Sequence, residues 1–363
     1  MNVESTKIGW LVAVGAMLLL AGAPAIAQKK PGGGTDPCAT AVGFPAFIYG
    51  VTISSSRGSE VEIRVADTDG RCSRLLGRTP GVERRPLLMS LGSGTWRAVW
   101  PDGDGYDITN DGLVVQDFTV GPQASVLPTG GGRMASGRAT GLEAASGGSF
   151  LYQTVDNGGL PSALWRAEVN TAADPMQRTV TATRLTGAAS CPWFEIAVGP
   201  DGDSIYFATW RADDIRGDVI RRVSLGSLAS AGDLGNLGCG VQVLETLGGH
   251  AVQLAAGTCA AGSGTCLAIE RHNVRGIPCT PDYYRTDVFA LDSGRSATLQ
   301  LAYPSWGPPG ALYGRQTGST SKNACTAKIY TTILRHQLDA NLTSGPVTTL
   351  GAATSIDAPN PMP

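Results

Sequence analysis

An internal repeat with a period of about fifty residues runs through most of this chain. The segment 98–106, AVWPDGDGY, recurs as 197–205, AVGPDGDSI, and midway between them residues 144–152, AASGGSFLY, have the same shape. Each copy joins two apolar stretches through a turn rich in Gly or Asp, which is typical of a β-hairpin. Because one such unit leaves an apolar face uncovered, the copies have to pack against one another.

A third and a fourth alternating segment follow each hairpin, and no stretch after the N-terminal region shows a helical period. This pattern gives six units of four short strands, and we expect the second strands to start near Phe47, Tyr106, Phe150, Ile205, Leu267 and Leu312. We expect the fourth strands to end near Leu76, Leu127, Leu185, Leu244, Leu301 and Leu350. Repeated four-stranded sheets predict an all-β fold, a six-bladed β-propeller of antiparallel blades.

Three segments carry a resemblance to a known family. Residues 200–208, PDGDSIYFA, resemble the core of the WD40-like repeats of TolB-type propellers. Residues 61–76 look like the continuation of that repeat, and LWRAE at 164–168 with TRLT at 183–186 follows the same pattern. The resemblance spans most of residues 45–363 and implies a protein that works by interactions in the cell envelope.

The two ends of the chain suggest how the ring closes. The first unit has a poor inner strand, because Gly32–Gly34 and Pro37 precede it. The segment 355–359, SIDAP, follows the sixth unit and has no hairpin of its own. We expect this C-terminal segment to supply the inner strand of blade one, which removes an exposed sheet edge.

The N-terminal region predicts export. Residues 1–27 have Lys7 near the start, an apolar run over 8–20, and the small-x-small site Ala25-Ile26-Ala27, as in a secretory signal peptide. An uncleaved membrane anchor is the alternative, which Gly22 and Pro24 disfavour. We therefore expect a linker at 28–44 and the propeller at 45–363 in a periplasmic or secreted protein without a membrane span in its mature part.

The even number of cysteines fits this compartment. The chain has eight cysteines, no C-x-x-C pair and three scattered histidines, so disulfides are favoured over zinc. The residues alone allow many connectivities. The blade arrangement favours the pairs Cys38–Cys72, Cys191–Cys239, Cys259–Cys266 and Cys279–Cys325.

Charge and motifs exclude several function classes. The chain has 28 basic and 30 acidic residues, which disfavours a nucleic-acid binder. It contains no G-x-S-x-G, H-E-x-x-H, P-loop or dinucleotide-binding motif, so we expect no catalytic residues and no cofactor. The turn Asp102–Asp107 alternates carboxylates and could hold calcium, but it lacks the Glu of an EF-hand and fits an ordinary turn. We therefore expect no metal.

Binding residues are expected where the inner strands start, at the mouth of the central channel. The candidates there are Arg97, Glu143, Trp193, Glu195, His250 and Trp306. Trp and Arg are common anchors of protein interfaces, although both tryptophans could instead pack between blades. The sequence thus predicts a non-catalytic propeller that binds a protein or peptide partner. The alternatives are a channel enzyme, such as a lyase, hydrolase or quinone-dependent dehydrogenase, and a display protein without a defined site.

Overall fold

The structure is a computed structural model, and its described residues except Asp36 belong to one compact unit, Pro37–Pro363. The expected signal peptide and the first part of the expected linker lie outside the described residues. The described ranges are 36–41, 43–55, 58–80, 85–103, 111–136, 139–155, 161–170, 179–187, 193–209, 219–232, 242–246, 249–260, 264–273, 284–319, 327–353 and 355–357.

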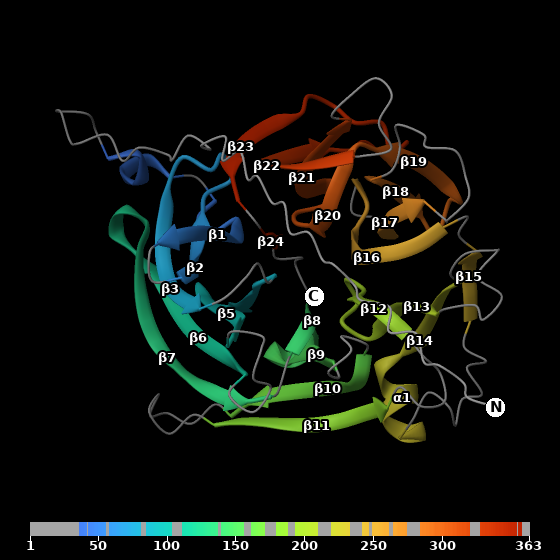
Figure 1. The fold of residues 1–363 in the computed structure, drawn as a ribbon, viewed down its shortest axis with the longest axis horizontal. Helices are drawn as coiled ribbons and strands as arrows, with labels where there is room; N and C mark the ends of the chain where they lie inside the picture. The colour runs from blue at the N-terminus through green and yellow to red at the C-terminus, as the bar shows by residue number, and fades with distance from the viewer. Residues whose placement is uncertain are drawn as a thin grey trace, which may run out of the picture. The chain divides into compact units, whose positions relative to one another are not determined.

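Six antiparallel sheets of four strands each follow one another around a centre, as the sequence predicts (Figure 1). From its inner to its outer strand, blade one consists of β24 (Ser355–Asp357), β1 (Phe47–Ser55), β2 (Gly58–Ala66) and β3 (Ser73–Pro80). Blade two consists of β4 (Leu87–Gly92), β5 (Thr95–Asp102), β6 (Gly112–Gly121) and β7 (Ser125–Ala135). Blade three consists of β8 (Ala139–Ala144), β9 (Phe150–Val155), β10 (Pro161–Val169) and β11 (Val180–Gly187).

The second half of the ring has the same plan. Blade four consists of β12 (Trp193–Val198), β13 (Ser204–Thr209), β14 (Val219–Ser224) and β15 (Gln242–Thr246). Blade five consists of β16 (Gly249–Thr258), β17 (Thr265–Asn273), β18 (Tyr284–Ala290) and β19 (Arg295–Leu299). Blade six consists of β20 (Leu301–Trp306), β21 (Ala311–Ser319), β22 (Ala327–Gln337) and β23 (Thr348–Ala352).

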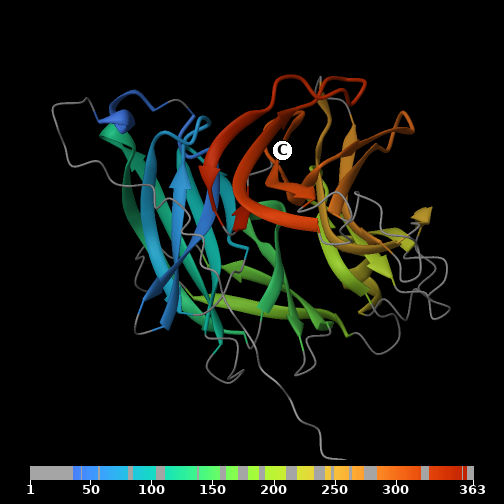
Figure 2. The ribbon, with the colours of Figure 1, turned by 45° about the horizontal axis from the view of Figure 1, so that its top comes forward.

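The blades stand side by side around the ring (Figure 2), and hydrophobic clusters lie between neighbouring blades. One cluster joins Ile63 of blade one to Trp100 of blade two, and another joins Leu164 of blade three to Phe207 of blade four. The second strand of blade four is covered on both faces, since all six residues of β13 are buried. The apolar alternation of the repeat therefore reflects packing of sheet against sheet around the ring.

The C-terminal strand closes the first blade, which confirms the prediction from the chain ends. β24 runs antiparallel to β1, with Ile48 opposite Asp357, Tyr49 opposite Ile356 and Gly50 opposite Ser355. β24 also contacts β20 of blade six, and β1 contacts β4 of blade two. The last strand thus joins both ends of the chain in one sheet.

Strand positions in blade two differ from the prediction. Residues 98–101 lie in the second strand, β5, whereas the matching residues at 197–198 lie in the inner strand β12. The inner hairpin of blade two turns at Ser93 and Gly94, whose φ angles are 51° and 75°. The Asp-rich turn after residue 101 therefore joins the second strand to the third. Inner and second strands have similar apolar sequences, so the repeat alone did not show which of the two strands residues 98–101 form.

A smaller correction concerns the junction of blades five and six. The fourth strand of blade five, β19, ends at Leu299, and Leu301 begins the inner strand of blade six. Only Gln300 separates the two strands, so the sequence shows no turn signal between them.

Two of the four expected disulfides are present. Cys38 of the 3-10 helix η1 (Pro37–Thr40) is bonded to Cys72, with a Cα–Cα distance of 4.6 Å. Cys259 is bonded to Cys266 across the β16–β17 hairpin, with a Cα–Cα distance of 5.1 Å. The cysteines of the other two expected pairs, Cys191 with Cys239 and Cys279 with Cys325, lie outside the described residues.

Helical structure in the described ranges is short. The α-helix α1 (Leu225–Ala231) is capped by Ser224, whose side chain accepts a hydrogen bond from the Ser227 amide. Two 3-10 helices, η2 (Pro122–Ala124) and η3 (Ser146–Gly148), lie in turns. Among the residues that the structure describes, no helix has the length and apolar character needed to cross a membrane.

Candidate functional site

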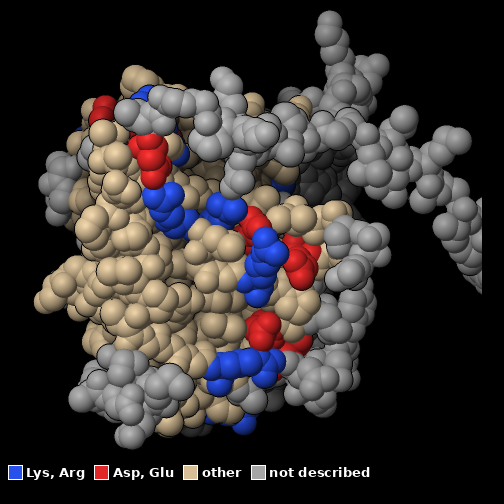
Figure 3. Space-filling view, turned by 90° about the vertical axis from the view of Figure 1, so that its left-hand side faces the viewer, with Lys and Arg blue, Asp and Glu red and all other residues tan. Residues whose placement is uncertain are grey.

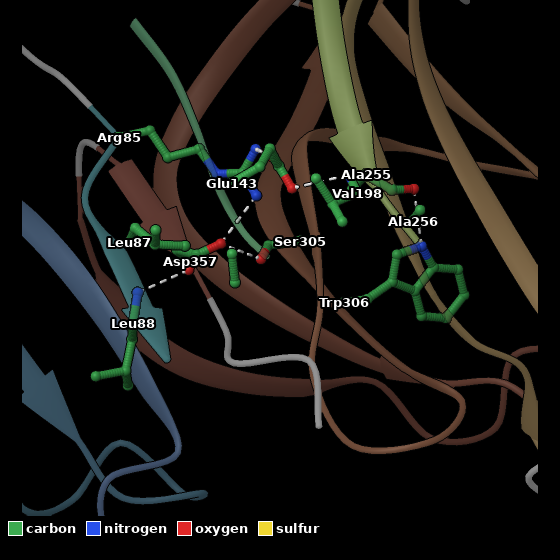
Figure 4. Close-up of a pocket in the computed structure, with 11 residues that line it drawn as sticks. Arg85, Leu87, Leu88, Glu143, Val198, Ala255, Ala256, Ser305, Trp306 and Asp357 are labelled. Atoms are coloured by element: carbon green, nitrogen blue, oxygen red, sulfur yellow. Dashed lines mark hydrogen bonds and ion pairs between the residues drawn. The ribbon is translucent and has the colours of Figure 1, made fainter. Parts of the chain in front are cut away.

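A cavity lies at the centre of the ring, where the inner strands of all six blades meet (Figure 4). The cavity is small, with a volume of about 20 Å³, which is room for about one water molecule, and it is partly open to solvent. The charged or hydroxyl-bearing residues that line it are Arg85, Glu143, Ser305 and Asp357, and its apolar wall is formed by Leu87, Leu88, Ala144, Val198, Ala255, Ala256 and Trp306.

One guanidinium group connects three blades at this cavity. Arg85 precedes β4, and its side chain is 20% exposed. Its Nη1 donates to Glu143 Oε1 of β8 at 3.2 Å, and its Nη2 donates to Asp357 Oδ1 of β24 at 2.8 Å. The guanidinium fork matches two acceptors at once, so Arg85 fixes blades one and three relative to blade two.

Asp357 connects the closing strand to its two neighbouring blades. Its Oδ2 accepts a hydrogen bond from the Leu88 amide of β4 at 3.0 Å, and its Oδ1 accepts one from Ser305 Oγ of β20 at 2.9 Å. Figure 4 shows both contacts beside the ion pair with Arg85. A single buried carboxylate therefore holds β24 between blades two and six.

The same kind of contact recurs at other junctions. Glu143 Oε2 accepts from the Val198 amide of blade four at 3.4 Å, and Glu270 Oε2 accepts from the Tyr303 amide of blade six at 2.7 Å. Tyr303 has a φ of 54°, a strained backbone that this contact helps to hold. These carboxylates satisfy inner-strand amides that would be costly to bury without a partner.

Acidic groups outnumber bases in this cluster. Burial raises the pKa of Glu143 to about 7, although Arg85 lowers it, and the charge of Asp357 raises it further. Burial also raises the pKa of Glu195, on β12, to about 8. The positive charge of Arg85 lowers the pKa of Glu195, whereas the negative charges of Glu143 and Glu270 raise it further. We call Glu143, Glu195, Glu270 and Asp357 together with Arg85 the channel cluster.

Two of the six candidate residues from the sequence belong to this cluster. Glu143 lines the cavity near the end of β8, and Glu195 lies within β12. Trp193 is the first residue of β12 and His250 the second of β16, but their side chains are outside what the structure describes. Glu143 and Glu195 were predicted at strand starts, and they are the fifth residue of β8 and the third residue of β12.

The predicted position of Arg97 is wrong. It lies on β5, the second strand of blade two, because the residues predicted to form the inner strand of that blade form its second strand. Its guanidinium forms a buried ion pair with Asp117, at 2.7 Å from Nε to Oδ1, and donates to the Gly148 carbonyl of blade three. Arg97 therefore connects two blades away from the channel mouth.

Trp306 lines the cavity and also packs between blades five and six. It is 2% exposed, and its Nε1 donates to the Ala255 carbonyl at 3.1 Å. A Cβ atom added at Gly257 would lie 2.3 Å from the Trp306 Cβ, so the backbone of β16 approaches this side chain closely. These contacts favour the packing interpretation over the binding one.

Sequence reasoning missed Arg85, Glu270, Ser305 and Asp357. Asp357 is the only charged residue of SIDAP and could have been marked once that segment was assigned to the ring. Arg85 stands directly before the apolar run 87–91, which was not assigned to an inner strand. Glu270 belongs to a second strand and gives no signal in the sequence.

The candidate calcium turn is described only in part. Asp102 pairs with Arg133 at 2.6 Å from Oδ2 to Nε, and residues 104–110 lie outside the described ranges. Within those ranges, no group of three or more acidic, histidine or cysteine side chains is arranged to hold a metal ion.

The outer face over blades one and two differs from the channel. Figure 3 shows basic and acidic side chains interspersed on this face, without a broad patch of one sign. Glu62 pairs with Arg64 and with Arg78, each at 2.8 Å. Charges of both signs in such close pairs give no steering field on this face.

Comparisons with known proteins concern the fold alone. No protein-family model and no curated protein matches the chain. It is similar to a solved structure of a nidogen–laminin complex, at 14% identity and a TM-score of 0.47, covering 88% of this chain and 100% of that one. It is also similar to a putative 6-phosphogluconolactonase from Bacteroides uniformis, at 9% identity and a TM-score of 0.44, covering 86% and 98%.

A third similar structure is that of a puromycin hydrolase, at 13% identity and a TM-score of 0.43. The match covers 86% of this chain and 48% of that one, so this chain spans about half the length of the hydrolase. At these identities no function is transferred, and the function has to be argued from the channel itself.

Proposed function

We propose that this chain is an exported, non-catalytic β-propeller that binds a protein or peptide partner at the mouth of its channel, through a cationic group of that partner. The resemblance of residues 200–208 to TolB-type repeats supports a place in the periplasm or outside the cell. The domain plan of a signal peptide at 1–27, a linker at 28–44 and a propeller at 45–363 belongs to this proposal.

The observation that carries the proposal is the excess of carboxylates over guanidinium in the channel cluster. Among the described residues of the cluster, Arg85 is the one base, and the four acidic residues come from blades one, three, four and five. A cationic group of a partner would relieve the repulsion among the carboxylates and would favour their ionised form. A cationic group gains most from this arrangement, whereas an anionic group would be repelled by the ionised carboxylates.

The hydrogen bonds of the cluster favour binding over catalysis. Asp357, Glu143 and Glu270 already accept backbone amides of neighbouring blades, which ties these carboxylates to the integrity of the ring. A general acid or base needs a proton that can move to and from substrate. Within the described part of the chain, the Glu195 side chain makes no hydrogen bond. It is therefore the carboxylate best suited to meet a partner.

A channel enzyme is the second candidate, and one observation favours it. The pKa of Glu143 is about 7 and that of Glu195 about 8, values that suit a general acid and base near neutral pH. Turnover of a small-molecule panel that is lost in Glu195→Gln would favour this enzyme and contradict the binding proposal.

The direct test is affinity capture with the purified exported chain, from the host's own envelope and secreted fractions. We expect a protein that is retained by the wild type and at least tenfold less by Glu195→Gln, since removing one charge of a buried pair weakens binding by about that much or more. Glu168→Gln is the matched control, because that side chain is 64% exposed on β10 of blade three, outside the channel cluster. Equal capture by both variants, or no specific protein in either fraction, would contradict the proposal.

A further inference from the structure

The strand that closes the ring is also its shortest inner strand. β24 has three residues and three paired positions with β1, whereas every other inner strand has six residues or more. Asp357, the residue of β24 whose side chain the structure describes, attaches the strand to Arg85, Leu88 and Ser305. A change in the charges around Asp357 therefore acts on the element that can yield most easily.

The groups that face these charges come from five elements. Glu143 on β8 faces Arg85 before β4, Asp357 on β24, and Glu195 on β12. Glu195 faces Arg85, Glu143 and, on β17, Glu270. Asp357 and Glu143 share one guanidinium, so each carboxylate that ionises beside Arg85 weakens the net attraction that holds Asp357.

We propose that β24 is a pH-dependent latch, which is held closed while Glu143 and Glu195 carry protons and is loosened when both ionise. With both groups protonated, Arg85 and Asp357 form a balanced pair. With both ionised, three or more buried carboxylates compete for Arg85, and the repulsion is relieved by moving the short strand that carries Asp357.

The direction of the pH dependence follows from the raised pKa values of Glu143 and Glu195. A carboxyl whose pKa is higher in the folded chain than in the unfolded one favours folding most below its ordinary value, near 4.5. That contribution is lost as pH rises through about 7 for Glu143 and about 8 for Glu195. The latch therefore loosens between pH 6 and pH 9, whereas paired acids with lowered pKa values would show the opposite trend.

Amide hydrogen exchange of the free protein tests the proposal. Protection factors, corrected for the intrinsic pH dependence of exchange, are measured at pH 6 and pH 9 for β24 and for Leu88, whose amide donates to Asp357. We expect protection at these sites to fall about tenfold or more at pH 9, while β13, which is buried throughout, changes little. In Glu195→Gln, which mimics the protonated side chain, most of this fall should disappear, and in Glu168→Gln it should remain.

Equal protection at both pH values, or the same fall in Glu195→Gln as in the wild type, would overturn the latch. Glu195→Gln is preferred to Glu143→Gln because Glu143 also accepts the Val198 amide, and its loss could disturb folding. No partner is present in this measurement, so its failure is separate from a failure of the binding proposal.

Discussion

Deletion of residues 355–363 should destabilise the protein more than any single substitution considered above. The truncated chain loses β24, exposes the edge of β1, and leaves Arg85 and the Leu88 amide without Asp357. Breaking one buried ion pair costs about 3–5 kcal/mol, and the total stability of a domain is about 5–15 kcal/mol. We therefore expect a loss of at least about 5 kcal/mol in the free energy of unfolding, and a ring that is open or unfolded at physiological temperature.

Thermal and urea unfolding of the truncated and full-length chains measure this effect. A shorter deletion of residues 358–363 retains all of β24 and is the matched control. A truncated chain that melts at the temperature of the full-length chain would show that β24 does not close the ring in solution.

The second large effect is expected for Trp306→Ala. Its indole is almost fully buried and donates to the Ala255 carbonyl, and Gly257, which lies against it, has no side chain that could move into the space left by the indole. Truncation of a buried Trp to Ala costs about 3–5 kcal/mol, because a cavity remains between the blades. We expect this loss of unfolding free energy in urea titrations.

Trp306→Phe is the matched control for this substitution. It keeps an aromatic ring and loses the Nε1 hydrogen bond, so its cost should be smaller, about 1–2 kcal/mol. Unchanged stability in Trp306→Ala together with loss of partner capture would contradict the packing interpretation and make Trp306 a binding residue.

Much of the architecture was predictable because a propeller repeats one local pattern. The third strands and most turns follow from alternation and from Gly and Asp positions, and the closing strand follows from an unpaired first unit. The strands of blade two were assigned wrongly because residues 98–101 and 197–200 have similar sequences but lie at different places within their blades. Alternation identifies a strand, but it does not identify the strand's place within a blade.

The channel cluster was predictable only in part, for a physical reason. Glu143 and Glu195 lie on inner strands, which the repeat locates approximately. Their pKa values are raised first by burial in the closed ring, and then by the charge of Asp357 for Glu143 and of Glu270 for Glu195, whereas Arg85 lowers both. These charged residues come from other blades and are distant in the sequence. Convergence of this kind follows from ring closure and leaves no local pattern.

A double-mutant cycle between Arg85 and Asp357 tests whether the closing strand and the channel cluster are energetically coupled as one structure. Urea unfolding is measured for the wild type, Arg85→Met, Asp357→Asn and the double variant. We expect each single variant to lose about 3 kcal/mol and the double variant to lose about 1–3 kcal/mol less than the sum, because the two side chains form one buried pair. Additive losses, within about 0.5 kcal/mol, would show that Asp357 and Arg85 act independently and would contradict the account.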